Sequence, residues 1–176
     1  MIDAPFSLEE VADRLAIEHV VNRYVHALDT RAYDALDDVF LPGCTFDIGG
    51  AGSQAALWPD VKAFYEASLL DTFPHYLHTL NNVLITFDAD RSTAHTVSKV
   101  INPAGQMGQD GRMHHFDFYG HWHDDWKRVP DGWRIANRRW ENLWIAGDYP
   151  FVSLPADAAN ADILLYFLEP SLMCFG

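Results

Sequence analysis

The chain has 176 residues, of which 49% are apolar and 21% charged, and its formal net charge is −13. These values fit one globular domain with a sizeable core and exclude a disordered chain. Acidic proteins repel phosphate backbones and anionic lipids, so we expect neither a nucleic-acid partner nor a membrane partner.

The chain also carries few signs of export. Its N-terminus has no basic and apolar signal-peptide pattern, and no apolar run approaches the ~20 residues of a membrane span. The two cysteines, Cys44 and Cys174, are far apart in sequence and form no metal-like motif. We therefore expect a cytoplasmic protein with reduced thiols.

Helical patterns dominate the first half of the chain. Ser7 followed by Glu10 is a capping-box pattern, and the apolar residues behind it recur at helical spacing. Pro42-Gly43 is expected to end a second, short helix, and a short strand should follow over 44–50. The predicted helices span residues 7–29, 31–40 and about 59–71.

From about residue 74 the apolar period changes to that of strands. Four extended stretches separated by turn residues are predicted at 78–90, 92–105, 112–129 and 132–147. Helices followed by hairpin-linked strands indicate an α+β fold, with helices packed on one face of a curved, mostly antiparallel sheet. We expect one domain over 1–148, and a tail over 149–176 that packs on it or on a neighbouring subunit.

Strand alternation predicts which side chains face inward. The even positions of 114–126 are mostly apolar and include Phe116, Phe118 and Trp122, whereas the strand that begins at His78 has a mixed even set. The faces expected to converge are the even positions of 78–86, 94–102 and 114–126. Together they would line an aromatic pocket of the kind that binds small molecules. A bulge in any strand would invert this alternation beyond it.

Nine histidines raise the question of a metal site. His121 and His123 share one strand face, but it is the polar, odd face, which we assign to solvent or an interface. We identify no cysteine or carboxylate that completes a ligand set, so we expect no cofactor and no catalytic metal.

Three segments, in order, resemble the SnoaL-like proteins of the NTF2-like superfamily. They are AIEHVVNRYVHALDTRAYDALDDVF, HTLNNVLITFDADRSTAHT and GHWHDDWKRVPDGWRIANRRWENLWIAGD, and the similarity covers about residues 8–148. The resemblance implies a cone of curved antiparallel sheet wrapped by three N-terminal helices. The superfamily includes scytalone dehydratase, bile-acid dehydratase, a dehydrochlorinase, ketosteroid isomerase and non-catalytic binding proteins.

The resemblance also implies a catalytic group. The dehydratase and dehydrochlorinase branches use an Asp–His dyad, which falls on Asp29 and His78, and Tyr24 falls on a pocket tyrosine of the bile-acid enzymes. Histidine is suited to take a proton near neutral pH, and a carboxylate on one ring nitrogen makes the other more basic. Without the resemblance, the residues alone favour Asp29 as the N-cap of the second helix and His78 as a structural histidine.

Other positions depart from the family pattern or are assigned to the pocket wall. Asn102 stands where scytalone dehydratase has a second catalytic histidine, for which His114 could substitute, and Asn142 stands where the bile-acid enzymes carry an arginine. The residues predicted to contact substrate are Asn102, His114, Phe116, Phe118, Trp122, Phe46 and Trp140.

These observations favour a cofactor-independent lyase, dehydratase-like, acting on a hydrophobic aromatic, polycyclic or steroid-like small molecule. An isomerase or cyclase would use much the same residues. Alternatives from other classes are a non-catalytic binding protein or accessory subunit of a ring-hydroxylating dioxygenase type, and an epoxide hydrolase. An epoxide hydrolase would need carboxylates with an arginine inside the cone. We also expect a homodimer or homotrimer.

Overall fold

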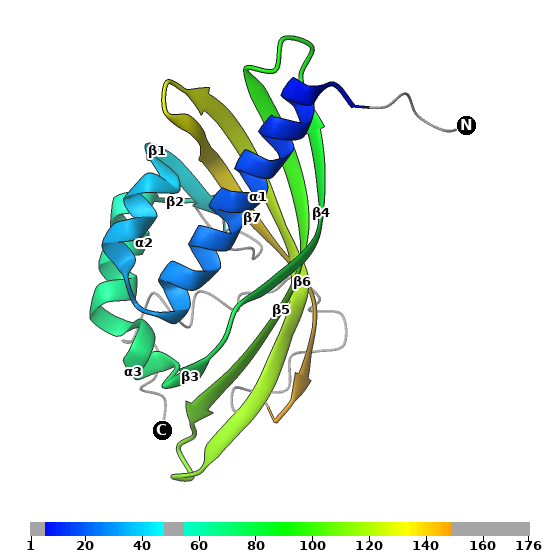
Figure 1. The fold of residues 1–176 in the computed structure, drawn as a ribbon. Coiled ribbons are helices and arrows are strands. Elements are labelled where there is room, and N and C mark those ends of the chain that lie inside the picture. Colours follow the sequence, from blue (N-terminus) through cyan, green and yellow to red (C-terminus); the bar gives the residue numbers. More distant parts are fainter. Residues whose placement is uncertain (1–5, 48–54, 149–176) are drawn as a thin grey trace.

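The protein is described here from a computed structural model, which covers residues 6–47 and 55–148 (Figure 1). Predictions on 149–176 and on Cys174 therefore lie outside the described residues. The elements are helix α1 (Leu8–Asp29), 3-10 helix η1 (Tyr33–Asp38), strand β1 (Phe40–Asp47), strand β2 (Ala56–Leu57), helix α2 (Trp58–Phe64), π-helix η2 (Tyr65–Leu69), helix α3 (Leu70–Thr72) and strands β3 (His75–Tyr76), β4 (Thr79–Phe87), β5 (Thr93–Met107), β6 (Met113–Val129) and β7 (Gly132–Gly147).

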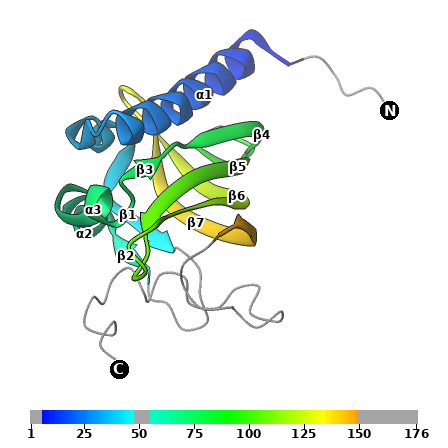
Figure 2. The same ribbon diagram turned by 90° about the horizontal axis from the view of Figure 1, so that it is seen from below.

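The seven strands form one curved sheet in the order β2-β1-β7-β6-β5-β3, with β4 also paired to β5. Every pairing is antiparallel except that of β1 with β7. Seen from below, α1 lies across one face of the sheet, while α2 and α3 lie beside its β1 edge (Figure 2). This arrangement confirms the predicted α+β cone.

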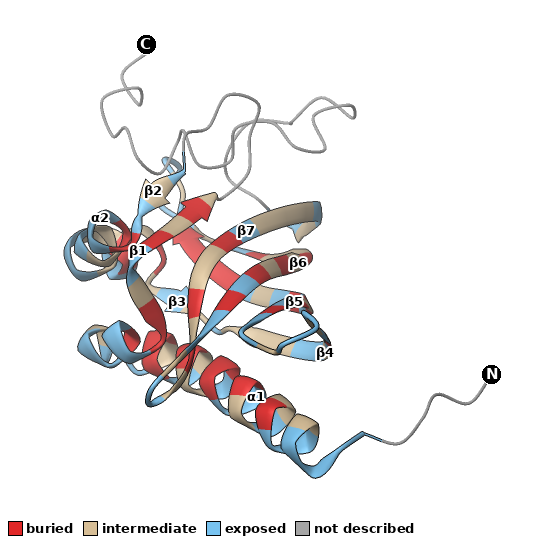
Figure 3. Cartoon of the chain, turned by 90° about the horizontal axis from the view of Figure 1, so that it is seen from above, coloured by how far each residue is buried: buried red, intermediate tan, exposed pale blue. Residues whose placement is uncertain are grey.

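Helix α1 begins where the capping pattern predicts. The Ser7 hydroxyl accepts a hydrogen bond from the Glu10 amide at 3.1 Å, which satisfies one of the first free amides of the helix. The Glu10 side chain does not return to Ser7 but pairs with Arg14. The buried stripe of α1 faces the sheet (Figure 3) and includes Ile17 and Leu28, so the main core lies between α1 and the sheet.

One local prediction was wrong. Pro42 and Gly43 do not end a helix but lie inside β1, at an irregularity in its pairing with β7, where a proline without an amide is tolerated. The predicted third helix is confirmed, because α2, η2 and α3 follow one another without a break, and its middle turn is π-helical.

The predicted alternation holds in β5 and β6 but fails in the second half of β4. Positions Asn81 and Leu84 pair with residues only two apart on β5, so β4 carries one extra residue, and Asn82 has a positive φ of 49°. Beyond this bulge Leu84 is exposed and Ile85 is buried, the reverse of the prediction.

Within the described residues, no helix has the length and apolar character needed to cross a membrane. The homodimer or homotrimer stays a prediction.

Candidate active site

Asp29 and His78 meet at the end of α1. Asp29 is the last residue of that helix, and His78 lies between β3 and β4. The Asp29 Oδ1 atom is 2.8 Å from the His78 Nδ1 atom, and the two carboxylate oxygens also accept from the His78 backbone amide at 3.1 and 3.2 Å. The side chains are 20% and 15% exposed, respectively. The predicted pair is therefore in direct contact across 49 positions of sequence.

This contact sets the direction in which the histidine can work. An ionised carboxylate only accepts hydrogen bonds, so the proton of the neutral His78 ring belongs on Nδ1. The other ring nitrogen, Nε2, then carries the lone pair and is the atom that can take a proton. The backbone amide bonds fix the Asp29 carboxylate as well, so the orientation of the ring is determined by the fold.

Tyrosines surround the His78 ring. The ring centroids of Tyr24 and Tyr76 lie 6.4 and 5.4 Å from that of His78, both edge-on. The Tyr76 hydroxyl donates a hydrogen bond to the Leu28 carbonyl. The Tyr24 side chain is buried, with 1% of its surface exposed. Burial raises the pKa of Tyr24, against the opposing effect of the nearby Arg138 charge. Its hydroxyl therefore remains protonated at neutral pH and can donate a hydrogen bond.

A buried ion pair inside the cone was missed by the sequence analysis. Arg138 and Asp124 are both 0% exposed and form two hydrogen bonds of 2.7 and 2.8 Å. The guanidinium carbon lies 4.0 Å above the Tyr24 ring and 4.9 Å from the Trp122 ring centroid. Burial on its own would lower the pKa of Arg138, but the Asp124 carboxylate outweighs it and raises that pKa.

A bulge explains why Arg138 was missed. Trp133 and Ile135 are buried, so simple alternation along β7 would turn Arg138 outward. Asp125 pairs with Asn137 and Trp126 with Ile135, which leaves one unpaired residue on β7 and reverses the alternation beyond it. The arginine inside the cone is thus Arg138, and not the residue at position 142 to which the resemblance pointed.

Polar atoms without partners gather on the inner face of the sheet. Buried polar groups in proteins almost always have a hydrogen-bond partner, so each of these atoms can accept or donate one more hydrogen bond. Six buried side-chain atoms lack a partner among the described residues: Ser98 Oγ, Asn102 Oδ1, Gln106 Oε1, Trp122 Nε1, Arg138 Nη1 and Asn142 Oδ1.

The predicted pocket residues lie in different surroundings. Phe116 and Trp122 are buried on the inner face of β6, and Trp140 pairs with Trp122 across the strands at a centroid distance of 4.9 Å. Phe46 is fully buried on β1, where it stacks on Trp58 as part of the core.

Three of the predicted pocket residues remain to be placed: Asn102, Phe118 and His114. Asn102 and Phe118 are register partners on the inner face of β5 and β6, and both are half-buried. His114 lies at the start of β6, where its ring nitrogens contact Asp148 at 2.7 Å and Asp110 at 2.9 Å. Both ring nitrogens of His114 thus contact carboxylates. Substrate contact by the seven predicted pocket residues stays a prediction.

Two surface pockets of about 400 and 440 Å³ lie apart from the dyad. The first is lined by the β4–β5 turn region together with Asp125 and Trp126, and the second by α2 with Asp37 and Phe40. Neither is lined by Asp29 or His78, so neither is assigned to the chemistry of the dyad.

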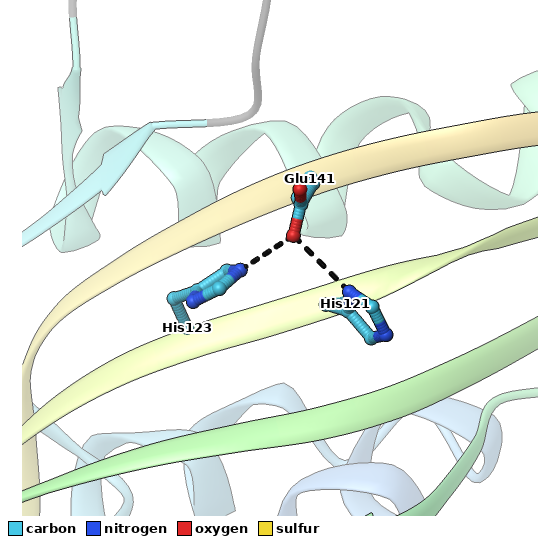
Figure 4. A group of neighbouring side chains, drawn as sticks. All are labelled: His121, His123 and Glu141. Carbon is cyan, nitrogen blue, oxygen red and sulfur yellow. Dashed lines mark hydrogen bonds and ion pairs between the residues drawn. The ribbon is translucent and has the colours of Figure 1, made fainter.

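A second titratable cluster lies on the opposite face of the sheet. The Glu141 Oε2 atom is 3.1 Å from His121 Nδ1 and 2.7 Å from His123 Nε2 (Figure 4). The expectation that no carboxylate completes a ligand set with these two histidines was therefore wrong. The missing carboxylate comes from the neighbouring strand, at a position that only the register of β6 with β7 reveals.

The curved sheet, the helix across it and the cone interior place this protein in the NTF2-like fold class. The chain belongs to the SnoaL-like domain family, whose family model matches residues 9–139. An uncharacterized protein of Mycobacterium tuberculosis is 35% identical over 133 residues, which cover 75% of this chain and 86% of the relative.

Solved structures with the same fold include two proteins named for elimination chemistry. A hexachlorocyclohexane dehydrochlorinase superposes with a TM-score of 0.69 at 12% identity, covering 85% of this chain and 98% of the other. A protein of Novosphingobium aromaticivorans, provisionally named a scytalone dehydratase, gives 0.69 at 18% identity, covering 84% and 95%. Another protein of that organism, provisionally named an aromatic ring hydroxylase, gives 0.66 at 26% identity, covering 82% and 96%.

Proposed function

We propose that this protein is a cofactor-independent lyase that eliminates water, or a comparable leaving group, from a hydrophobic aromatic, polycyclic or steroid-like small molecule. The observation that carries the proposal is the 2.8 Å contact between Asp29 and His78, beside an inner sheet face that holds Arg138 and several unpaired polar atoms. The fold shared with a dehydratase and a dehydrochlorinase is consistent with this chemistry.

The elimination would begin at His78. Its Nε2 atom would take a proton from a substrate carbon, and the electron pair of that C–H bond would become the new C=C bond. Asp29 would stabilise the imidazolium that forms, as a carboxylate does for a catalytic histidine.

The leaving group would depart with the electrons of its own bond to carbon. The protonated Tyr24 hydroxyl would donate a hydrogen bond to a departing hydroxide, and the Arg138 charge would stabilise negative charge that develops on the substrate. Little water reaches these side chains, so both interactions are stronger than they would be in solvent. An isomerase would use the same base and return the proton to another carbon, whereas a cyclase would use the electron pair of the broken C–H bond to form the new ring bond.

The buried ion pair bears on the epoxide hydrolase alternative. Such an enzyme would need more than one carboxylate around an arginine inside the cone, whereas Arg138 pairs with Asp124 alone and its Nη1 atom has no acceptor among the described residues. This favours the elimination reading. A binding protein or accessory subunit stays the main alternative, and one structural neighbour carries a ring-hydroxylase name.

The test is a panel of aromatic, polycyclic and steroid-like alcohols with an acidic C–H beside the carbon that carries the hydroxyl. Conversion is followed by mass spectrometry for the loss of one water and by absorbance of the new conjugated bond. We expect His78→Gln to lower turnover by about 10²–10⁴-fold, the usual contribution of a general base. Asp29→Asn should lower it less.

The matched control is His26→Gln, which changes an exposed histidine near the end of α1. It should turn over substrate like the wild type. Full activity in His78→Gln would contradict the dyad. Compounds that bind to the wild type but are never converted would support the binding-protein alternative instead.

A further inference from the structure

The cluster of His121, His123 and Glu141 is held by two neighbouring strands. His121 and His123 are two positions apart on β6 and therefore point to the same side of the sheet. Glu141 is the register partner of His121 on β7, so its side chain rises from that same face. Trp122 lies between the histidines and is buried on the inner face, which places the cluster on the side away from the dyad.

The donor atoms of the cluster are already gathered. His121 offers Nδ1, His123 offers Nε2 and Glu141 offers Oε2, and these atoms all lie within 4.8 Å of one another. A Zn²⁺-like ion with bonds of about 2.0–2.2 Å needs its ligand atoms roughly 3–3.5 Å apart. The separations of 3.1 and 2.7 Å from Glu141 are close to this requirement, and the two histidine nitrogens lie within 4.8 Å of each other, so side-chain movements alone would bring the three atoms to it.

The chemistry of the ligands selects the kind of ion. Two imidazole nitrogens and one carboxylate oxygen suit borderline first-row ions such as Zn²⁺ and Co²⁺, whereas Mg²⁺ and Ca²⁺ prefer all-oxygen sites. The side chains are between 19% and 38% exposed, so an ion could enter from solvent and keep open positions for water or a further ligand.

The electrostatic surroundings permit such an ion. The two imidazole contacts, first His123 and then His121, lower the pKa of Glu141, which keeps its carboxylate ionised. Lys99 and Arg139 are the cationic register partners on the adjoining strands, but both are exposed. Their long side chains can extend into solvent, away from a bound cation.

We propose that His121, His123 and Glu141 form a binding site for a divalent transition-metal ion of the Zn²⁺ class on the outer face of the sheet. In the ion-free protein the same three groups hydrogen-bond to one another. The ion replaces the imidazole protons that point at Glu141 and joins β6 to β7. The site is separate from Asp29 and His78 and does not depend on the proposed elimination.

The experiment uses the full chain without a histidine tag, freed of metal by a chelator, and titrates it with ZnCl₂ by calorimetry. We expect one equivalent to bind to the wild type. Glu141→Gln and His123→Gln each remove one ligand and should weaken binding at least 10–100-fold, the range seen even when an outer-shell partner of a metal ligand is lost. Co²⁺ should give a visible absorption band in the wild type that is lost in Glu141→Gln.

The matched control is His114→Gln, on the same strand, which removes a histidine that also contacts carboxylates but lies outside the cluster. It should bind Zn²⁺ like the wild type. Circular dichroism of each metal-free variant shows whether it is folded, and a Zn²⁺-dependent rise in melting temperature, present in the wild type and the control only, gives a second readout. Equal binding by wild type and Glu141→Gln, or a loss that follows His114→Gln, would overturn the proposal.

Discussion

The buried pair of Asp124 and Arg138 allows a stability prediction to be worked from the structure. Both side chains are 0% exposed and are joined by bonds of 2.7 and 2.8 Å. Arg138→Met would leave the Asp124 carboxylate buried without its partner, which costs about 3–5 kcal/mol. For a chain of this size, 1 kcal/mol corresponds to about 2–4 °C, so the melting temperature should fall by about 6–20 °C.

The double variant Asp124→Leu with Arg138→Met removes both charges at once. Apolar replacements of a buried ion pair are often neutral or stabilising, so we expect its free energy of unfolding to lie within about 2 kcal/mol of the wild type. The assay is urea unfolding of the wild type, both single variants and the double variant, followed by tryptophan fluorescence and circular dichroism.

The four measurements form a double-mutant cycle. Its coupling energy should be about 3 kcal/mol or more, because each single variant is damaged mainly by the charge that it leaves behind. A double variant that is destabilised by the sum of the two single changes would refute this reasoning. It would show that the two side chains contribute to stability independently of each other.

Three further predictions rest on single residues. Asp13 pairs with Arg128; burial alone would raise the pKa of Asp13, but its bonds to Arg128 and Trp133 lower that pKa overall. The stability that Asp13 contributes is therefore present above about pH 4 and is lost as pH falls through its lower native pKa. Urea melts of Asp13→Asn should differ from those of the wild type at pH 7 and converge with them in acid. Gly120→Ala should lower stability by about 1–3 kcal/mol in the same melts, because a Cβ atom there would lie 2.2 Å from the Glu141 carbonyl oxygen. Burial raises the pKa of Cys44 to about 12, so peptide mapping should find it alkylated only after unfolding.

The positions of Asp29 and His78 in the fold could be predicted from the sequence, because each depends on short-range features. Asp29 ends a helix whose capping and apolar spacing are plain, and His78 directly precedes β4, the first long strand after the change of period. What brings them together is the family resemblance, since nothing local to either residue predicts a contact across 49 positions. Composition and strand alternation alone predict which sheet face lines a pocket, but they do not predict that Asp29 contacts His78.

The residues that were missed depend on strand register. Arg138 turns inward only because β7 carries an extra residue after Ile135, and Leu84 turns outward because β4 carries one after Asn81. Bulges leave little trace in composition, and each inverts every assignment beyond it. Glu141 was overlooked for a related reason, since its partners on β6 are 18 and 20 residues away and are identified only by pairing.

The buried ion pair of Asp124 and Arg138 can be related to the proposed chemistry on the inner face of the sheet. If apolar side chains would hold the fold as well as Asp124 and Arg138 do, stability gives no reason for a charged arginine inside the cone. The proposed elimination offers a functional reason, because the pair holds the guanidinium 4.0 Å above Tyr24 while its Nη1 atom has no acceptor among the described residues. Under the proposed mechanism, Asp124 fixes a cation against Tyr24, whose ring lies 6.4 Å from that of the proposed base, and this cation would stabilise negative charge on a substrate. The double variant should thus remain folded and lose turnover, a combination that a purely structural ion pair would not produce.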